Sequence, residues 1–342
     1  MIRMSDIAAK AGVSRATVSL VLNNKHASVG IAEDTRRRVL SAARQLGYRP
    51  NEVARAMVTG KNRVIVYLVN DPSLEVAARI LAGAMNEAEP LGYSVKLVAR
   101  DGAWGESVIE RCVELRPVGL MGLYVPPSLY RHIQEETARY RIPVTLLDSS
   151  FPLEGLTRVL SDDEDGVYQG LAHLHRLGHR RIAHIAGWRH SGAATTREAA
   201  YRRVMARLGL PVPEGYVACG EWVIETIEEV TRTLLAHPER PTALFCADDK
   251  TALIAIRTAE RLGVRVPEDL SVLGFADLEM ARYGNPPLTT VAQPFPELGA
   301  AAVRYLLDAA RRLEGGEDHG TAEILLPNRL IVRESTGPPR DT

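Results

Sequence analysis

The chain has 342 residues, of which 46% are hydrophobic and 25% are charged, an ordinary globular composition whose length favours one small domain beside a larger body. The longest apolar runs, such as 64–69, are too short to cross a bilayer, and the N-terminus lacks the apolar stretch of a secretory signal, so we expect a cytoplasmic protein. Three scattered cysteines, Cys112, Cys219 and Cys246, argue against a disulfide framework.

The net charge of zero hides an uneven distribution along the chain. Residues 1–60 hold ten basic and four acidic residues, a net charge of +6, so the rest holds 32 basic and 38 acidic residues, a net charge of −6. A basic N-terminal segment on an acidic body fits a segment that meets a polyanion such as DNA. An ordinary solvated charged surface is the alternative that charge alone leaves open.

Residues 5–23 predict two short helices joined by a tight corner. Ser5 is a candidate cap for the first helix, and Gly12 ends that helix. Ser14 can cap the second helix by accepting a hydrogen bond from the amide of Thr17. Two short helices joined by a glycine-containing turn are typical of the helix-turn-helix motif.

The second helix has two unlike faces. Val18, Val21 and Leu22 fall on one side at 100° per residue, where they can pack on the first helix. On the other side, Leu20 and Ala16 can contact thymine methyl groups in a major groove and Arg15 can pair with guanine. A three-helix bundle without a DNA role is the alternative. The DNA contacts predicted in this head are Ser5, Ser14, Arg15, Ala16, Thr17, Ser19, Leu20 and Asn23.

Residues 32–47 predict a third helix, because Val39, Ala43 and Leu46 recur at helical spacing and Gly47 is a natural stop. In the segment that follows, 48–60, a proline ends any earlier helix and only one or two helical turns remain. So short a helix is not stable alone, so we expect it to order when something binds it.

The sequences DIAAKAGVSRATVSLVLN (6–23) and TRRRVLSAARQLGYRPNEVARAM (35–57) closely resemble the head and hinge of the LacI/GalR family. The resemblance implies that Arg15 and Ala16 read the major groove of a palindromic operator. It also implies that two hinge helices, one from each subunit, meet in the minor groove. The hinge contacts that it predicts are Asn51, Ala54, Arg55 and Met57.

Two residues of this segment depart from the family pattern. Met57 replaces a leucine that wedges into the central base step, and methionine can serve as such a wedge. Leu20 replaces an arginine that usually reads a base. We expect this second change to shift the preferred half-site toward methyl contacts and to weaken binding.

From residue 63 onward, apolar runs alternate with helical patterns. Such runs are typical of buried parallel strands, and two sets of them predict two doubly wound lobes with a crevice between them. The first set comprises 64–69, 94–99, 118–125 and 143–147, and the second comprises 181–187, 216–219, 242–247 and 270–275.

The body is similar to the sensor core of the same family, a fold shared with periplasmic sugar-binding proteins. The segments that carry the likeness are 170–187, 241–281, 286–294 and 326–336. The likeness implies that the chain crosses between lobes near 160, 290 and 322. The expected fold is therefore an all-α helix-turn-helix head and an α/β two-lobed core. The expected parts are a head (1–47), a hinge (48–62), and a body (63–342) with lobe 1 over 63–160 and 291–322 and lobe 2 over 161–290 and 323–336.

Five polar or aromatic residues of the body are candidates for binding a small polar ligand, the effector. Asp71, Asp148 and Asp248 follow predicted strands, Arg197 begins a helix, and Trp222 lies just past another strand. Acids that accept hydroxyl groups, an arginine and a stacking tryptophan are common in such sites, which lie at strand ends in open α/β sheets. Strand-end caps and surface charges are the alternative. The family's effector positions match these residues.

The body also departs from the family pattern. Ala276 stands where the family commonly has an aspartate that binds effector, and Leu74, Glu75, Val76 and Ala77 replace Asn-Pro-Phe-Phe. One acceptor and an aromatic wall are therefore missing. We expect an altered pocket for an unidentified ligand, for example a sugar or a related metabolite. The alternative is a regulator that is independent of a ligand or is controlled by a protein.

Four histidines, His173, His175, His179 and His184, fall within twelve residues but do not predict a metal site. His173 and His175 diverge on a helix, and Gly178 should end that helix before His179. Their stretch also matches a structural part of the family.

The pair Asp248 and Asp249 resembles two catalytic acids, but adjacent residues of an extended strand point to opposite faces. No catalytic motif is evident, so we expect neither an enzyme nor a cofactor.

The sequence therefore predicts a transcriptional regulator, by family expectation a repressor, that binds a palindromic operator as a homodimer under the control of a small effector. The chain shows no leucine heptad tail, which favours a dimer over a tetramer. An architectural DNA binder without an effector and a plain solute-binding protein are the rival classes. The basic head argues against the second.

Overall fold

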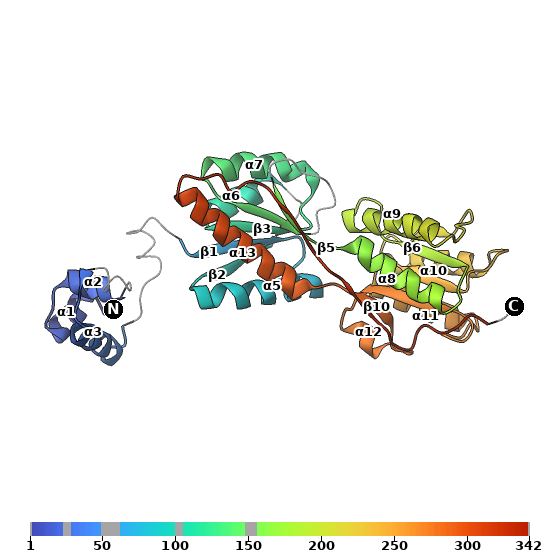
Figure 1. Ribbon diagram of the computed structural model, residues 1–342, viewed down its shortest axis with the longest axis horizontal. Coiled ribbons are helices and arrows are strands. Elements are labelled where there is room, and N and C mark those ends of the chain that lie inside the picture. Colours follow the sequence, from blue (N-terminus) through green and yellow to red (C-terminus); the bar gives the residue numbers. More distant parts are fainter. Residues whose placement is uncertain (1, 23–28, 49–61, 100–104, 148–155, 341–342) are drawn as a thin grey trace. The chain divides into compact units, whose positions relative to one another are not determined.

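The computed structural model describes residues 2–22, 29–48, 62–99, 105–147 and 156–340 (Figure 1). The chain forms two compact units, Met1–Asn62 and Arg63–Thr342. We call the first unit the head and the second the body. No helix among the described residues combines the length and hydrophobicity that a membrane crossing requires.

The head contains helices α1 (Met4–Ala11), α2 (Arg15–Leu22) and α3 (Glu33–Gln45). Its core is a cluster in which Ile7, Val18 and Val39 are completely buried. The face of α2 that was predicted to pack inward does so, since Val18 and Val21 are buried and Leu22 packs against the same cluster.

The capping predictions had different outcomes. Ser14 Oγ accepts a hydrogen bond from the Thr17 amide at 3.1 Å, as predicted, and Gly12 ends α1 in the left-handed conformation with φ of 66°. Ser5 was wrongly expected to cap α1. The helix begins at Met4 and the cap is Arg3, two residues earlier than expected, because the Asp6 carboxylate accepts a hydrogen bond from the Arg3 amide at 2.8 Å.

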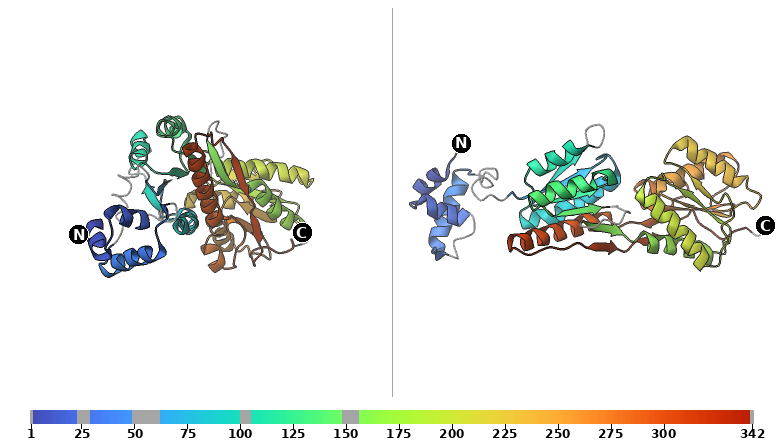
Figure 2. Two further views of the ribbon diagram at one scale, coloured as in Figure 1. Left: turned by 60° about the vertical axis from the view of Figure 1, so that its left-hand side comes forward. Right: turned by 90° about the horizontal axis from the view of Figure 1, so that it is seen from above.

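The body consists of two lobes, each built on one six-stranded sheet (Figure 2). The sheet of lobe 1 has the strand order β11-β5-β4-β3-β1-β2 and is parallel throughout. Its strands are β1 (Val64–Val69), β2 (Ser94–Ala99), β3 (Gly119–Leu123), β4 (Val144–Leu147), β5 (Thr157–Ser161) and β11 (Glu323–Leu326).

Helices cover both faces of the lobe 1 sheet. One face packs on α5 (Glu75–Ala88) and α13 (Phe295–Glu314), and the other packs on α6 (Glu106–Glu114) and α7 (Tyr130–Arg139). Along β1, Ile65 and Tyr67 point to the first face and Val66 and Leu68 to the second, so every residue of this run is used in a core. Short 3-10 turns lie at Glu89–Leu91 and Pro127–Leu129.

The sheet of lobe 2 has the order β12-β10-β9-β8-β6-β7, and only β12 is antiparallel to its neighbour. Helices α8 (Asp163–Arg176) and α9 (Gly192–Arg207) cover one face, while α10 (Ile224–Leu235) and α11 (Asp249–Arg261) cover the other. The remaining elements are β6 (Ile182–Ala186), β7 (Val217–Cys219), β8 (Ala243–Cys246), β9 (Ser271–Ala276), α12 (Met280–Tyr283), β10 (Thr289–Ala292) and β12 (Arg329–Ile331).

The chain crosses between the lobes after β5, after β10 and after β11. The last crossing was expected near 322, with 323–336 in lobe 2, and this is wrong for β11. That strand pairs with β5, and Ile324 and Leu326 pack on the lobe 1 core, so lobe 1 continues to Leu326.

Two further contacts join the lobes. The Arg79 guanidinium of lobe 1 donates to the carbonyl oxygen of Asp277 in lobe 2 at 2.9 Å. The Glu279 amide donates to the Glu75 carboxylate at 3.0 and 3.1 Å.

Candidate functional site

The outward face of α2 is the candidate DNA-contacting surface of the head. Arg15 and Ala16 are exposed at its N-terminal end, and Thr17, Ser19 and Leu20 are partly exposed. A leucine kept partly in solvent gives this face an apolar spot beside the Arg15 charge, which suits thymine methyl groups beside a hydrogen-bonding base. Ser5 is exposed on α1.

Ser14 has a structural role as well as a predicted DNA contact. Its hydroxyl caps α2 and lies 2.9 Å from the hydroxyl of Thr17, so part of its hydrogen-bonding capacity is used within the head. The other predicted DNA contacts, Asn23, Asn51, Ala54, Arg55 and Met57, lie outside the described residues.

A cavity of about 280 Å³ lies between the two lobes at the crossings. The lobe 1 side is mainly apolar, and the side formed by lobe 2 and the crossings is polar and charged. The apolar lining residues are Val76, Ile80, Leu123, Leu147, Leu160, Phe295, Leu298 and Leu325, and the polar ones are Tyr124, Arg158, Ser161, Asp162, Asp163, Glu164, Thr196, Arg197, Gln293 and Glu323.

Arg197 is the central charged group of this cavity. It is almost completely buried, and its Nε donates to Asp163 at 2.7 Å. Its Nη1 donates to the carbonyl oxygen of Ala247 at 2.7 Å and its Nη2 to the side chain of Gln293 at 3.1 Å. The guanidinium also lies 4.0 Å from the ring centre of Phe275. These contacts fix the orientation of Arg197 before any ligand arrives.

The Arg197–Asp163 pair links all three crossings. Asp163 follows the first crossing, and Gln293, in the second, donates to the Asp163 carboxylate at 3.3 Å and to Ser161 at 2.6 Å. Asn328, in the third, donates to the same carboxylate at 3.3 Å. Any change in the angle between the lobes bends these crossings. The network therefore connects the cavity to the three segments that join the lobes.

The sequence analysis missed Asp163, Gln293 and Asn328. Gln293 and Asn328 lie beside short strands and Asp163 lies within the acidic run 162–165, and nothing in the local pattern distinguishes them from turn or helix-capping residues. They come together only in the folded chain, because Asp163 is 130 positions from Gln293 and 165 positions from Asn328 in the sequence.

Among the other predicted effector residues that the structure describes, Asp71, Trp222 and Asp248 do not line the cavity. Asp71 follows β1 and accepts hydrogen bonds from the amide and hydroxyl of Ser73, at 2.9 and 2.7 Å. Asp248 caps α11 by accepting from the Thr251 amide at 2.7 Å, so the alternative of a strand-end cap describes its contact in this structure. Asp148 lies outside the described residues.

Trp222 has an unusual environment. Its backbone is in the left-handed region, with φ of 58°, and its indole lies so close to Gly187 that any side chain there would collide with it. The indole Nε1 is buried and has no hydrogen-bond partner among the described residues. The strand end therefore holds a donor that a ligand oxygen could satisfy.

Asp249, beside Asp248, points into lobe 2. It accepts hydrogen bonds from the hydroxyl of Thr290 and from the amide of Leu278. Burial, with smaller contributions from Asp248 and Asp277, raises its pKa from 3.8 to about 7. The two carboxylates thus differ in direction and in environment, and they do not form an acid pair.

The histidines serve the interior of lobe 2. Helix α8 ends before Gly178, as expected, and His179 lies within hydrogen-bonding distance of Thr242, Ser271 and the carbonyl oxygen of Gly337. His184 is completely buried between aromatic rings, and burial lowers its pKa to about 4. These contacts give both rings a packing role.

Two family models match the chain. Residues 3–51 match the model described as bacterial regulatory proteins, lacI family, and residues 171–336 match that of the periplasmic binding protein-like domain. The second match covers most of lobe 2 and the end of lobe 1.

Curated relatives match along almost the whole chain. The HTH-type transcriptional repressor CytR of Escherichia coli is 32% identical over 97% of this chain and 96% of its own length. The HTH-type transcriptional regulator DegA of Bacillus subtilis is 32% identical over 97% of both chains. The repressor PurR of Photobacterium profundum is 30% identical over 98% of both.

Solved structures give the same result. A lac repressor dimer bound to operator and the anti-inducer ONPF is 30% identical, with a TM-score of 0.79 over 98% of this chain and 99% of that chain. A complex of the transcriptional regulator CelR with cellobiose is 28% identical, with a TM-score of 0.71 over 98% and 100% of the two chains.

Proposed function

The chain belongs to the lacI family of bacterial regulatory proteins and is a DNA-binding transcriptional regulator, and we propose that it represses its target genes from a palindromic operator as a homodimer. The observation that carries this proposal is the outward face of α2, with exposed Arg15 and Ala16 beside partly exposed Leu20 on a basic head. Since the target is DNA, we place the protein in the cytoplasm.

Operator recognition is tested by incubating the purified protein with fragments of the source genome and sequencing the fragments that bind. The salt concentration is fixed at about 100 mM, where the Debye length is ~10 Å, because protein–phosphate contacts weaken as salt increases. We expect a palindrome with two half-sites. The variant Arg15→Ala should lose selectivity at one base position of each half-site. Enrichment without a two-fold pattern would contradict binding as a symmetric dimer.

The dimer proposal is supported by apolar side chains that lie in solvent in both lobes. Met85 of α5 and Leu97 of the edge strand β2 are 47% and 38% exposed in lobe 1. Met280 and Tyr283 of α12 are 44% and 78% exposed in lobe 2. These elements lie along one side of the body (Figure 1), so a two-fold partner could cover them together.

Tyr283→Asp should weaken the dimer by tenfold or more, about 1.4 kcal/mol, because it places a charge in an apolar interface. Sedimentation equilibrium measures the change. Tyr140→Asp is the matched control, since Tyr140 is an exposed tyrosine at the end of α7, on the other face of the lobe 1 sheet. Equal behaviour of the two variants would remove Tyr283 from the interface.

The cavity at the crossings supports control by a small polar effector. A ligand there would meet the apolar wall of lobe 1 and the fixed charges around Arg197 in lobe 2. A ligand that hydrogen-bonds to Arg197 or Asp163 would change the contacts that these two residues make with the crossings. The geometry of the crossings would then depend on whether the effector is bound in the cavity. The spacing of the two heads of a dimer would change with it.

A second candidate is a regulator without a small effector. It is favoured by the observation that Nε, Nη1 and Nη2 of Arg197 all donate to groups of the protein itself, and that Ala276 replaces the expected acceptor. A thermal-shift screen of sugars, nucleosides and amino acids separates the two candidates. A large stabilisation by a compound of one class supports the effector, and its absence from all three classes supports the alternative.

A further inference from the structure

We infer that lobe 2 carries a second ligand site, for the phosphate group of a small molecule, at the end of its sheet opposite the crossings. The site lies beside Arg181 and Thr242, which directly precede the parallel strands β6 and β8. The cavity between the lobes instead involves residues that follow strands, such as Gln293 after β10. The two cavities share no lining residue.

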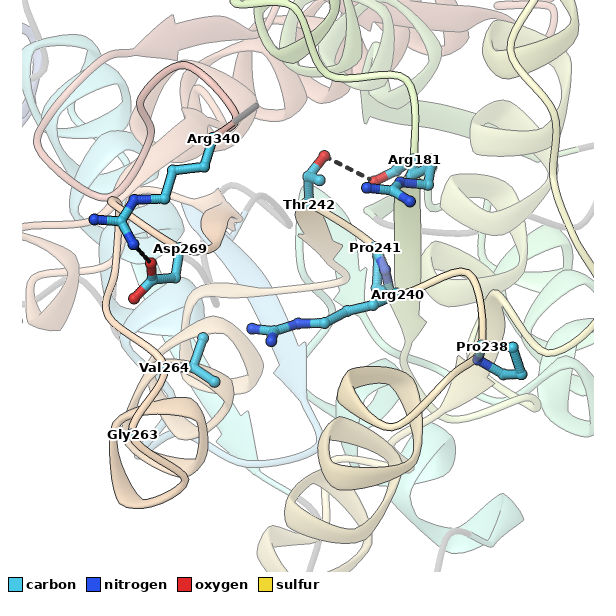
Figure 3. A pocket seen from close by; sticks show the side chains of 9 residues that line it. All are labelled: Arg181, Pro238, Arg240, Pro241, Thr242, Gly263, Val264, Asp269 and Arg340. Carbon is cyan, nitrogen blue, oxygen red and sulfur yellow. Dashed lines mark hydrogen bonds and ion pairs between the residues drawn. The ribbon is translucent and has the colours of Figure 1, made fainter. Parts of the chain in front are cut away.

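The second cavity has a volume of about 370 Å³ (Figure 3). Three arginines reach it from segments that are far apart in the sequence. Arg181 precedes β6, Arg240 precedes β8, and Arg340 belongs to the segment after β12. The other lining residues are Pro238, Pro241, Thr242, Gly263, Val264 and Asp269.

The lining carries an excess of positive charge on a body that is acidic as a whole. Asp269 is the one acidic side chain among the described residues of the lining, and Arg340 and Arg265 already pair with it, each at 2.7 Å. The hydrogen bond from Arg265 holds the pKa of Asp269 well below its usual range, so this carboxylate stays ionised. Three guanidinium groups against one carboxylate leave the lining with a net charge of +2.

Arg240 supplies an observation that points directly to a ligand. Its Nη2 is buried and has no hydrogen-bond partner in the described part of the chain. Figure 3 shows its side chain extended toward Val264, with Asp269 and Arg340 on the same side of the view and with Thr242 and Arg181 above it. A buried charged donor without an acceptor is unfavourable, and an anion in the cavity would satisfy it.

The backbone segments that carry the other two arginines are held by hydrogen bonds within lobe 2. The segment that carries Arg340 is attached to lobe 2 through Gly337, whose amide donates to Ser271 at 3.0 Å and whose carbonyl oxygen lies 2.8 Å from His179. The carbonyl oxygen of Arg181 accepts a hydrogen bond from the amide of Thr242 at 2.9 Å. The site is thus built from segments that are hydrogen-bonded to one another in lobe 2.

A phosphate group fits this arrangement better than a carboxylate does. Guanidinium groups that approach from separate segments can bind separate oxygens of a tetrahedral dianion, whereas a carboxylate offers two oxygens in one plane. The apolar side chains of Pro238, Pro241 and Val264 border the charged part and can contact the carbon skeleton of a small phosphate ester.

Isothermal titration calorimetry of the full chain, at constant ionic strength, tests the site. The probes are inorganic phosphate and glycerol 3-phosphate, with glycerol as the neutral control and succinate as the carboxylate control. We expect both phosphates to bind with a dissociation constant of about 1 mM or tighter, and glycerol 3-phosphate to bind more tightly than inorganic phosphate. Arg240→Gln should weaken binding by tenfold or more.

The matched control is Arg257→Gln, since Arg257 is exposed on α11 and does not line the cavity. It should bind both phosphates as the unmodified chain does. Arg340→Gln repeats the test at an exposed side chain in case Arg240→Gln does not fold, and it should also weaken binding. Binding of neither phosphate, equal weakening by Arg257→Gln, or tighter binding of succinate than of phosphate would each overturn the assignment.

Discussion

The two lobes of the body have similar sheets but place their polar groups very differently. Among the described residues, the polar side chains buried within lobe 1 are three threonines, Thr137, Thr145 and Thr157. Lobe 2 and the crossings bury charged and ionisable residues as well: Asp163, His179, His184, Arg197, Asp249 and Asp277. Lobe 1 is therefore an apolar scaffold, and lobe 2 holds an internal network whose charges are fixed in position.

This difference separates two tasks that a sensor must perform. A buried charge network has few alternative arrangements, so lobe 2 can present donors and acceptors in fixed directions. The apolar wall of lobe 1 makes no directional hydrogen bonds, so it can pack against any ligand that lobe 2 binds. If this division is correct, substitutions of polar groups should be costly in lobe 2 and nearly neutral in lobe 1.

The largest effect is expected from Asp163→Ala, which leaves Arg197 buried without its partner. The free energy of unfolding should fall by about 3–5 kcal/mol, as for other buried ion pairs with one member removed. Urea unfolding measures it. Glu164→Ala is the matched control, because the neighbouring Glu164 pairs with Arg203 at the surface and such pairs contribute about 0–1 kcal/mol. Similar losses in the two variants would contradict the expectation that the buried network stabilises the fold more than a surface ion pair does.

A smaller effect is expected from the packing of lobe 1. Helices α5 and α13 approach so closely that a side-chain carbon at Gly299 would overlap the backbone of Ile80. Gly299→Ala should therefore lower the free energy of unfolding by about 1–3 kcal/mol, the usual range for overpacking. Gly315→Ala, at the end of the same helix, meets only ordinary contacts and serves as the control. A neutral Gly299→Ala would show that the helices can separate without cost.

The pH dependence of stability tests the burial of Asp249. Its pKa is raised from 3.8 to about 7, so between these values the folded state keeps a proton that the unfolded state releases. The contribution of this group is full below about pH 4 and is lost as the pH rises toward 7. The melting temperature of Asp249→Asn, minus that of the unmodified chain, should therefore increase between pH 4 and pH 8. A constant difference would mean that Asp249 titrates normally.

The smallest effect is expected from Thr145→Val in lobe 1. The Thr145 hydroxyl is buried and has no hydrogen-bond partner among the described residues, so an isosteric apolar side chain should change stability by less than about 1 kcal/mol, or raise it. In lobe 2, Thr290→Val removes the hydrogen bond to Asp249 and should cost about 1–3 kcal/mol. Equal costs would show that the two lobes treat buried hydroxyl groups alike.

The features that could be predicted from the sequence are those that depend on neighbouring residues. Capping by Ser14, the stop at Gly12 and the inward face of α2 follow from spacing within one or two turns. The eight apolar runs became strands because runs of this kind are typical of parallel sheets, although β2 and β7 lie at the edges of their sheets and are only partly buried.

The features that could not be predicted depend on contacts between distant segments of the chain. Strands β5, β10, β11 and β12 were not predicted, because they are short, contain polar residues, and are held by partners on other parts of the chain. The network of Asp163, Arg197, Gln293 and Asn328 and the cluster of Arg181, Arg240 and Arg340 each join segments that are far apart in the sequence. The sequence around a polar residue does not show which distant residue it will contact, because only the folded chain brings the two together.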